Sequence, residues 1–160
     1  TALLSITPFD WPSIFTALAC GTIIGIERQI RGKPAGIRTS ALIILGTYIF
    51  MACSIYVSQS ATMSDPSRII GQVITGIGFL GAGVMLSKGR SVYGVTSAAT
   101  IWSLAAVGVC IGIGQLGSAF KLSIVVVIVL FGVDLFEDYS QRIGQRMQSR
   151  YSDWRNRDDE

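Results

Sequence analysis

Hydrophobic residues along this chain form five long runs, separated by short stretches rich in glycine, proline and charged residues. A helix that crosses a membrane needs about 20 predominantly apolar residues, and each run comes close to that length. The pattern predicts an all-α membrane bundle of five transmembrane helices in one domain, residues 1–138. The expected helices extend approximately from Trp11 to Ile30, Thr39 to Val57, Arg68 to Leu86, Thr96 to Gly114 and Leu116 to Phe136.

The composition supports a membrane protein and argues against an enzyme. Of the 160 residues, 50% are hydrophobic and only 14% are charged, whereas soluble domains carry about 25% charged residues. The chain has no histidine, which removes the usual general base, and no serine or cysteine has an evident activating partner. We therefore expect no catalytic residues, no cofactor, no metal site and no nucleic acid partner. The three cysteines are widely spaced and are expected to act as small buried hydrophobes: Cys20, Cys53 and Cys110.

The positive charges predict an orientation. With five spans, 11 of the 13 Lys and Arg residues fall on one side of the membrane, and only Arg68 and Lys121 fall on the other. Because short cytoplasmic loops carry an excess of Lys and Arg, we expect the amino terminus outside and the carboxyl terminus in the cytoplasm. Lys121 and Asp134 lie near the ends of the fifth run, where each side chain can reach its own interface.

Glycine is frequent within the apolar runs. Gly76, Gly78 and Gly81 formally match the dinucleotide motif G-x-G-x-x-G, but that motif needs a preceding strand and a βαβ unit, and here it lies inside an apolar span. Small residues at four-residue steps instead let helices approach closely, within one chain or across a homo-oligomer, with a dimer favoured. The glycines expected at helix contacts are Gly21, Gly25, Gly71, Gly76, Gly78, Gly81, Gly83, Gly108 and Gly112.

The densest polar segment lies between the first two runs. One interpretation is a positive anchor with a Pro/Gly turn. The other is a structured site for an anion, an anionic lipid headgroup or a partner, in which Gly32 and Gly36 form a nest of backbone N–H groups and Thr39 caps the next helix. The residues of this loop site are Glu27, Arg28, Arg31, Gly32, Lys33, Pro34, Gly36, Arg38 and Thr39.

Charged residues at the same predicted membrane boundary favour an ion-pair cluster. An ionisable residue at a membrane boundary needs a partner and is a candidate site. We expect the cluster to act as a structural latch more than as an ion or proton pathway. Its expected members are Glu27, Arg28, Lys88, Arg90, Asp134 and Glu137.

The tail, residues 139–160, alternates apolar and basic positions at helical spacing. A short amphipathic helix lying on anionic lipids is expected there; a solvated extension of the fifth span and a partner-docking helix are the alternatives. The residues expected to face lipid are Arg142, Arg146, Arg150, Tyr151 and Trp154.

Three runs of residues resemble the MgtC/SapB family of bacterial inner-membrane proteins. They are E-R-Q-I-R-G-K-P-A-G-I-R-T at Glu27 to Thr39, R-I-I-G-Q-V-I-T-G-I-G-F-L-G-A-G-V-M-L at Arg68 to Leu86, and G-V-T-S-A-A-T-I-W at Gly94 to Trp102. Only 24 residues follow Phe136, so the resemblance covers the hydrophobic domain without the ACT-like carboxy-terminal domain of many members. Ser40 stands where the family often has histidine.

The resemblance implies a non-enzymatic regulatory membrane protein. Relatives of this type are associated with magnesium limitation, virulence and intracellular survival, and with modulation of the proton-driven ATP synthase through membrane helix contacts. A small-solute or ion transporter or channel of the inner membrane is the alternative function, with Glu27, Arg28 and Asp134 lining its route. A third hypothesis is a lipid-organising module whose basic loop and tail bind anionic headgroups.

Overall fold

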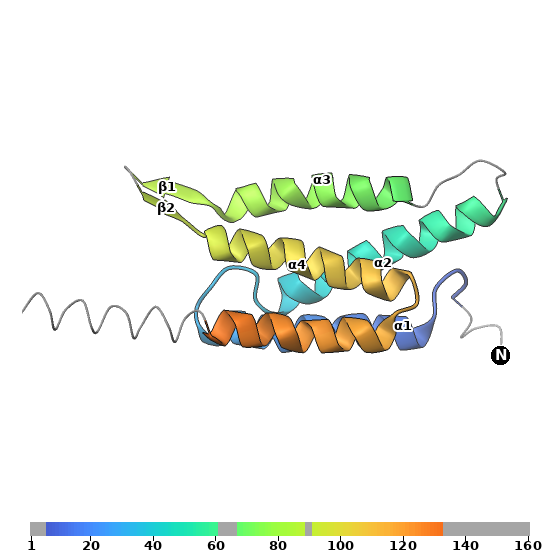
Figure 1. The fold of residues 1–160 in the computed structure, drawn as a ribbon, viewed down its shortest axis with the longest axis horizontal. Coiled ribbons are helices and arrows are strands. Elements are labelled where there is room, and N and C mark those ends of the chain that lie inside the picture. Colours follow the sequence, from blue (N-terminus) through green and yellow to red (C-terminus); the bar gives the residue numbers. More distant parts are fainter. Residues whose placement is uncertain (1–5, 61–66, 89–90, 133–160) are drawn as a thin grey trace, which may run out of the picture. The chain divides into compact units, whose positions relative to one another are not determined.

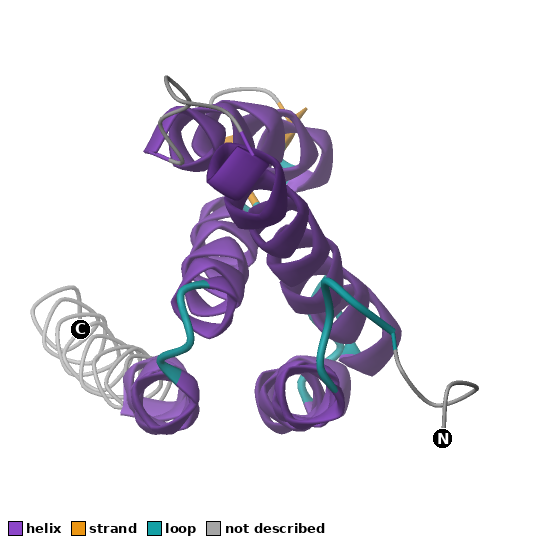
Figure 2. Ribbon diagram, turned by 90° about the vertical axis from the view of Figure 1, so that its right-hand side faces the viewer, coloured by secondary structure: helices purple, strands orange, loops and turns teal. Residues whose placement is uncertain are grey.

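The computed structural model describes residues 6–60, 67–88 and 91–132, and almost all of these are helical. The chain divides into two compact units, residues 1–127 and residues 128–160. Within the first unit, Figure 1 shows α2 tilted across the other helices, and Figure 2 views the helices nearly end-on. The elements are α1 (Trp11–Ile30), α2 (Ile37–Ser60), α3 (Ser67–Val84), β1 (Leu86–Lys88), β2 (Ser91–Tyr93), α4 (Val95–Gly112) and a last helix, Leu116–Gly132.

The predicted all-α class is confirmed. Among the described residues, three helices are long and apolar enough to cross a membrane, namely α2 over Ile37–Gln59, α3 and α4, while Leu116–Gly132 is apolar but shorter. The first apolar run matches α1 from end to end. The predicted amphipathic tail helix lies outside the described residues.

Two helices end before their predicted ends, and α2, predicted from Thr39 to Val57, extends beyond both ends of that range. α4 ends at Gly112 instead of Gly114, because Gly114 adopts a positive φ of 80° and the N–H of Gln115 donates back to the carbonyl of Cys110 at 2.9 Å. This is a helix-ending turn of the kind that glycine permits. α3 ends at Val84, two residues before the predicted end at Leu86.

The reason for the early end of α3 is a β-hairpin that the hydrophobic pattern did not indicate. β1 pairs with β2 in antiparallel register, with Leu86 opposite Tyr93. Gly94, at φ 87°, then leads into α4, and a Cβ there would collide with the carbonyl oxygen of Val84. In the sequence only Gly89 and Arg90 separate the strands, and a two-residue Gly-X linker is a known hairpin signal. The apolar residues around it concealed that signal.

The core lies where α1, α2 and α4 meet. Its fully buried side chains include Ala17 and Ile24 of α1, Ile44 and Met51 of α2, and Leu104 of α4. The loop between α1 and α2 and the hairpin between α3 and α4 lie at the same end of the helices, on the left in Figure 1. The basic segments between α1 and α2 and between α3 and α4 therefore lie at the same end of this unit.

Asp10 begins α1 at the opposite end. Its Oδ2 accepts a hydrogen bond from the Ser13 N–H at 2.8 Å, and its Oδ1 accepts one from the Tyr48 hydroxyl of α2 at 3.2 Å. Partial burial raises the pKa of Asp10, but the hydrogen bonds from Ser13 and Tyr48 outweigh that effect, so the pKa lies below its usual value. This carboxylate caps α1 and ties it to α2.

We expect the stability that Asp10 contributes to disappear in acid. Because its pKa is lowered in the folded state, its contribution is complete above its unfolded pKa of about 3.9 and is lost as the pH falls through the lower folded value. Asp10→Ala should cost about 1 kcal/mol at neutral pH, as for other helix caps. Asp10→Asn should keep the cap and lose its pH dependence. Thermal unfolding in detergent from pH 7 to pH 3 measures both effects, and a parallel loss of stability in Asp10→Asn would contradict this account.

Candidate functional site

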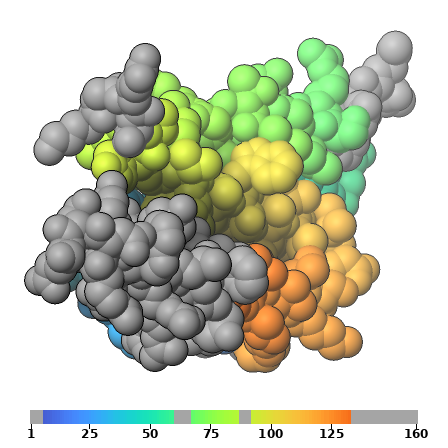
Figure 3. Space-filling model, turned by 60° about the vertical axis from the view of Figure 1, so that its left-hand side comes forward, coloured from blue at the N-terminus to red at the C-terminus, as the bar shows by residue number. Residues whose placement is uncertain are grey.

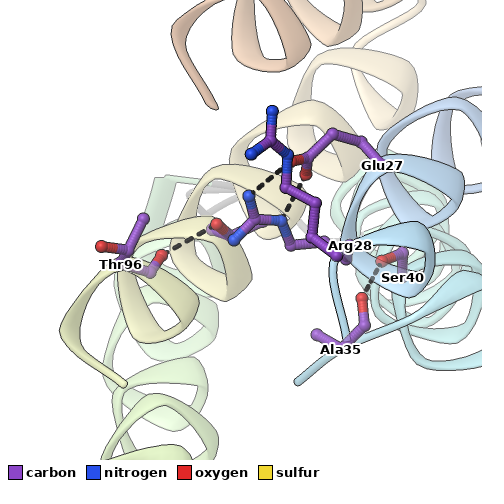
Figure 4. A network of polar contacts seen from close by, with 7 residues as sticks. Glu27, Arg28, Ala35, Ser40 and Thr96 are labelled. Atoms are coloured by element: carbon purple, nitrogen blue, oxygen red, sulfur yellow. Dashed lines mark hydrogen bonds and ion pairs between the residues drawn. The ribbon is translucent and has the colours of Figure 1, made fainter. Parts of the chain in front are cut away.

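The strongest polar cluster among the described residues lies at the end of α1. Glu27 and Arg28 are only 2% and 1% exposed. Arg28 binds the Glu27 carboxylate through both Nε and Nη2, with Nη2 2.8 Å from Oε1. Arg31, one turn later and partly exposed, places its Nε 3.2 Å from the same Oε1. Figure 4 shows the Glu27 carboxylate and the Arg28 guanidinium turned toward each other.

Burial makes this pair energetically consequential. Two adjacent charges leave water together, and the attraction between them must offset a desolvation cost of several kcal/mol for each ion. The bidentate geometry of a guanidinium on a carboxylate is the arrangement best suited to that task. Each of these two buried charges therefore needs the other to offset its desolvation cost. Arg31 adds a weaker, partly solvated contact.

One donor of the cluster is unsatisfied. Arg28 Nη1 is buried and has no hydrogen-bond partner within the described part of the chain. The Arg28 guanidinium extends toward α4 near Thr96, whose carbonyl accepts a hydrogen bond from the Thr100 hydroxyl at 2.8 Å (Figure 4). An unsatisfied buried donor costs about 1–3 kcal/mol. We therefore regard this end of α1 as a candidate functional site and not only as a stabilising contact.

The loop after the pair differs from the predicted anion nest. The N–H of Gly32 donates to the Gln29 carbonyl at 3.1 Å, and the N–H of Lys33 donates to the Arg28 carbonyl at 2.9 Å. These bonds form a Schellman cap in which Gly32 has a positive φ of 62°. Because both N–H groups are used to end α1, they are not free to bind an anion, and the nest prediction was wrong at Gly32.

The other half of the loop also departs from expectation. The second residue with positive φ is Ala35, at 65°, and not Gly36. The Ala35 carbonyl accepts a hydrogen bond from the buried Ser40 hydroxyl at 2.8 Å, which holds this left-handed residue in place. Thr39 lies inside α2, which begins at Ile37, so it does not cap that helix. Pro34 is exposed.

The structure brings together only part of the predicted ion-pair cluster. Glu27 and Arg28 pair as expected, and Arg31 joins them from the loop site. Lys88 lies in β1, but its side chain is not among those described. Arg90, Asp134 and Glu137 lie outside the described residues, as do the predicted lipid-facing residues of the tail, Arg142, Arg146, Arg150, Tyr151 and Trp154. The described residues contain no group of three or more His, Cys, Asp or Glu placed to hold a metal.

The predicted helix-contact glycines fall into two groups. Gly21 and Gly25 of α1 face the backbone of α2, and Gly108 and Gly112 of α4 face Thr47 and Met51 of α2. Gly81 is in ordinary contact distance of Ala98, where an added Cβ would lie 3.6 Å from the Ala98 Cβ. For the other four, no described residue lies within 4 Å of an added Cβ, and close packing there between chains stays a prediction: Gly71, Gly76, Gly78 and Gly83.

The cysteines are all free within the described residues. Cys20 is buried, Cys110 is partly buried and Cys53 is exposed. The expectation of a buried side chain was therefore wrong for Cys53. Its position on the outer surface of α2, an apolar helix, is compatible with contact with lipid in place of protein.

Comparison with known proteins decides the family. The sequence model of the MgtC family matches residues 14–139, which include the buried pair, the loop and the described helices. The chain belongs to the MgtC family. The resemblance that the three sequence runs indicated is thereby confirmed.

Curated relatives of this MgtC-family chain are considerably longer. It is 40% identical over 133 residues to "Protein MgtC" of Salmonella typhimurium strain LT2, covering 83% of this chain and 54% of that protein. It is 45% identical over 122 residues to "Putative magnesium transporter YhiD" of Escherichia coli strain K12, covering 73% of this chain and 56% of that protein. An uncharacterised protein of Haemophilus influenzae is 33% identical over 143 residues, covering 85% of this chain and 60% of that protein. The MgtC-family chain thus spans little more than half the length of these relatives, and no solved structure matches it.

Proposed function

We propose that this protein is a non-enzymatic regulatory membrane protein that responds to magnesium limitation by contacting another membrane protein through its helices. Membership of the MgtC family supports this proposal, and the name of the E. coli relative connects that protein with magnesium. The partner implied by the family resemblance is an inner-membrane complex such as the proton-driven ATP synthase. A second copy of the chain is the alternative partner, since it also presents helices within the membrane.

The observation that carries the proposal is the open surface of α3. Gly81 is the one residue of α3 that is buried in the described chain. Figure 3 shows α3, in green, at the molecular surface beside α4, in yellow. Gly71, Thr75, Gly78 and Ala82 share one side of α3, since they recur every three or four residues. Small residues let membrane helices approach closely, so this small-residue face of α3 suits contact with a helix of another chain.

We also propose five membrane crossings, with the amino terminus outside and the carboxyl terminus in the cytoplasm of an inner-membrane protein. The segregation of 11 of 13 positive residues supports this topology. So does the location of the α1–α2 loop and the hairpin at one end of the helices (Figure 1). Reporter fusions after residues 33, 63, 89 and 115 test it, since they should alternate between cytoplasmic and external signals.

The proposed function predicts that bulky residues on the small-residue face abolish activity. The double variant Gly71→Leu/Gly78→Leu should fold, because nothing lies within 4 Å of an added Cβ at either site. It should fail to change cellular ATP level and membrane potential at low magnesium in a host lacking its own MgtC-family gene. It should also lose crosslinks to the ATP synthase or to a second copy. Gly76→Leu, on another side of the same helix, is the matched control and should keep its crosslinks to the partner.

Two results would contradict the regulatory proposal. The first is normal regulation by the Gly71→Leu/Gly78→Leu variant at normal membrane abundance. The second is magnesium uptake by liposomes that contain only the purified chain, which would favour the transporter alternative.

A further inference from the structure

A deep apolar groove runs between α2 and α3. Its volume is about 610 Å³, within the range of about 300–1,000 Å³ typical of small-ligand sites. Its wall includes Thr39, Gly46 and Phe50 of α2 and Ile69, Gly76 and Leu80 of α3. No described residue lies within 4 Å of a Cβ built on Gly46 or Gly76, so these two glycines deepen the groove from opposite sides. Its lining is predominantly apolar, which suits a hydrocarbon chain.

One end of the groove meets uncompensated positive charge. Thr39 lines that end, and the preceding residue, Arg38, lies one helical turn before Leu42, another lining residue. Arg38 and Lys33 are exposed and make no ion pair within the described residues. Glu27, the acidic residue of this segment, is already occupied by Arg28 and Arg31. Two exposed positive side chains thus adjoin this end of the apolar groove, whereas one, Arg68 beside the lining residue Ile69, adjoins the other end. The end with Lys33 and Arg38 is therefore the better match for the headgroup of an anionic lipid.

The length of the groove matches one leaflet. From Thr39 to Phe50 the helix rises by roughly 16 Å, while half of the hydrocarbon core of a bilayer is roughly 15 Å. From the membrane boundary that carries the basic loop, the α2 wall of the groove thus extends over about the length of one leaflet. An acyl chain anchored at that boundary has this extent.

We propose that the α2–α3 groove binds an acyl chain of an anionic glycerophospholipid whose phosphate is held by Arg38. Lys33, in the same loop, adds to the positive potential at the headgroup. The lipid would fill the space between two helices that make few direct contacts of their own, and so would set the position of α3 relative to α2. This inference does not rest on the proposed regulatory role, because the groove and the small-residue face lie on roughly opposite sides of α3.

Native mass spectrometry of the full chain in mild detergent tests the proposal, with palmitoyl-oleoyl phosphatidylglycerol as the probe and palmitoyl-oleoyl phosphatidylcholine as the neutral comparison. The unmodified protein should retain phosphatidylglycerol preferentially. Arg38→Gln should lower that retention about fivefold, the effect expected for one arginine near an anionic headgroup. Lys121→Gln is the matched control, because Lys121 is an exposed positive residue of the helix Leu116–Gly132, which does not line the groove, and it should retain lipid normally.

Filling the groove should have the same effect without changing any charge. Gly76→Leu and Gly46→Leu should each lower phosphatidylglycerol retention, whereas Gly78→Leu should not. For partner crosslinking the expectation is the reverse, since changes at Gly78 should reduce the crosslinks and Gly76→Leu should not. Failure of the lipid proposal is therefore distinguishable from failure of the regulatory proposal. Equal retention by all variants would overturn the lipid site and would identify the bound lipid as adventitious.

A crosslinker in the groove identifies its occupant directly. Benzoylphenylalanine at position 50 in the full chain, irradiated in native membranes, should form adducts with phospholipid that diminish in Arg38→Gln. Adducts formed instead with a second copy or with another protein would show that a helix occupies the groove, and would overturn the proposal.

Discussion

Glu27→Gln is expected to destabilise the folded protein by about 3–5 kcal/mol, the loss typical when one member of a buried ion pair is removed. The neutral side chain leaves the Arg28 guanidinium, which is 1% exposed, without a counterion. Arg31 cannot compensate, since it carries the same charge and is itself partly exposed. Thermal unfolding in detergent, followed by circular dichroism, measures the loss.

Two further variants test whether the effect of Glu27→Gln comes from leaving the buried Arg28 charge without its partner. Glu27→Gln combined with Arg28→Met should recover most of the lost stability, because no charge is then left buried. Arg31→Gln should cost no more than about 1 kcal/mol, as for other partly solvated ion pairs. If Glu27→Gln unfolds like the unmodified protein, the pair is not buried in the folded state.

Gly25→Ala is expected to destabilise the folded protein by about 1–3 kcal/mol, the usual cost of overpacking. The added Cβ would lie 2.5 Å from the Ile37 Cα and 2.8 Å from the Ile37 nitrogen. Both are backbone atoms at the start of α2, so the helices must separate to admit the methyl group. Because α1 carries Glu27 and Arg28 within the next turn, that separation also disturbs the buried pair.

Gly46→Ala is the matched control for this prediction. Gly46 lies in the interior of α2, and a Cβ added there would have nothing within 4 Å. Alanine at this position should be neutral or should stabilise the helix by about 0.5–1 kcal/mol, since glycine is the poorer helix former. Unfolding temperatures in one detergent compare the two variants, and equal effects at Gly25 and Gly46 would contradict the packing account.

The sequence by itself determined the class of the protein, its family and the location of its helices. Apolar runs of nearly 20 residues leave a chain in a membrane few alternatives to helices, because each helix satisfies its own backbone hydrogen bonds. The apolar run from Trp11 to Ile30 coincides with α1. The Glu27–Arg28 pair was also predictable in part, because charged residues at a membrane boundary need partners.

Only the tertiary structure decided which small residues and charges meet. Small residues recur at helical spacing in a packed helix and in an open one alike, but Gly21 and Gly25 face α2 whereas Gly71 and Gly78 touch nothing within the described chain. Likewise, the spacing of Arg28, Arg31 and Arg38 does not indicate which arginine is buried. Contacts between residues distant in sequence depend on how α1, α2 and α4 cross, and a linear pattern contains no information about crossing angles.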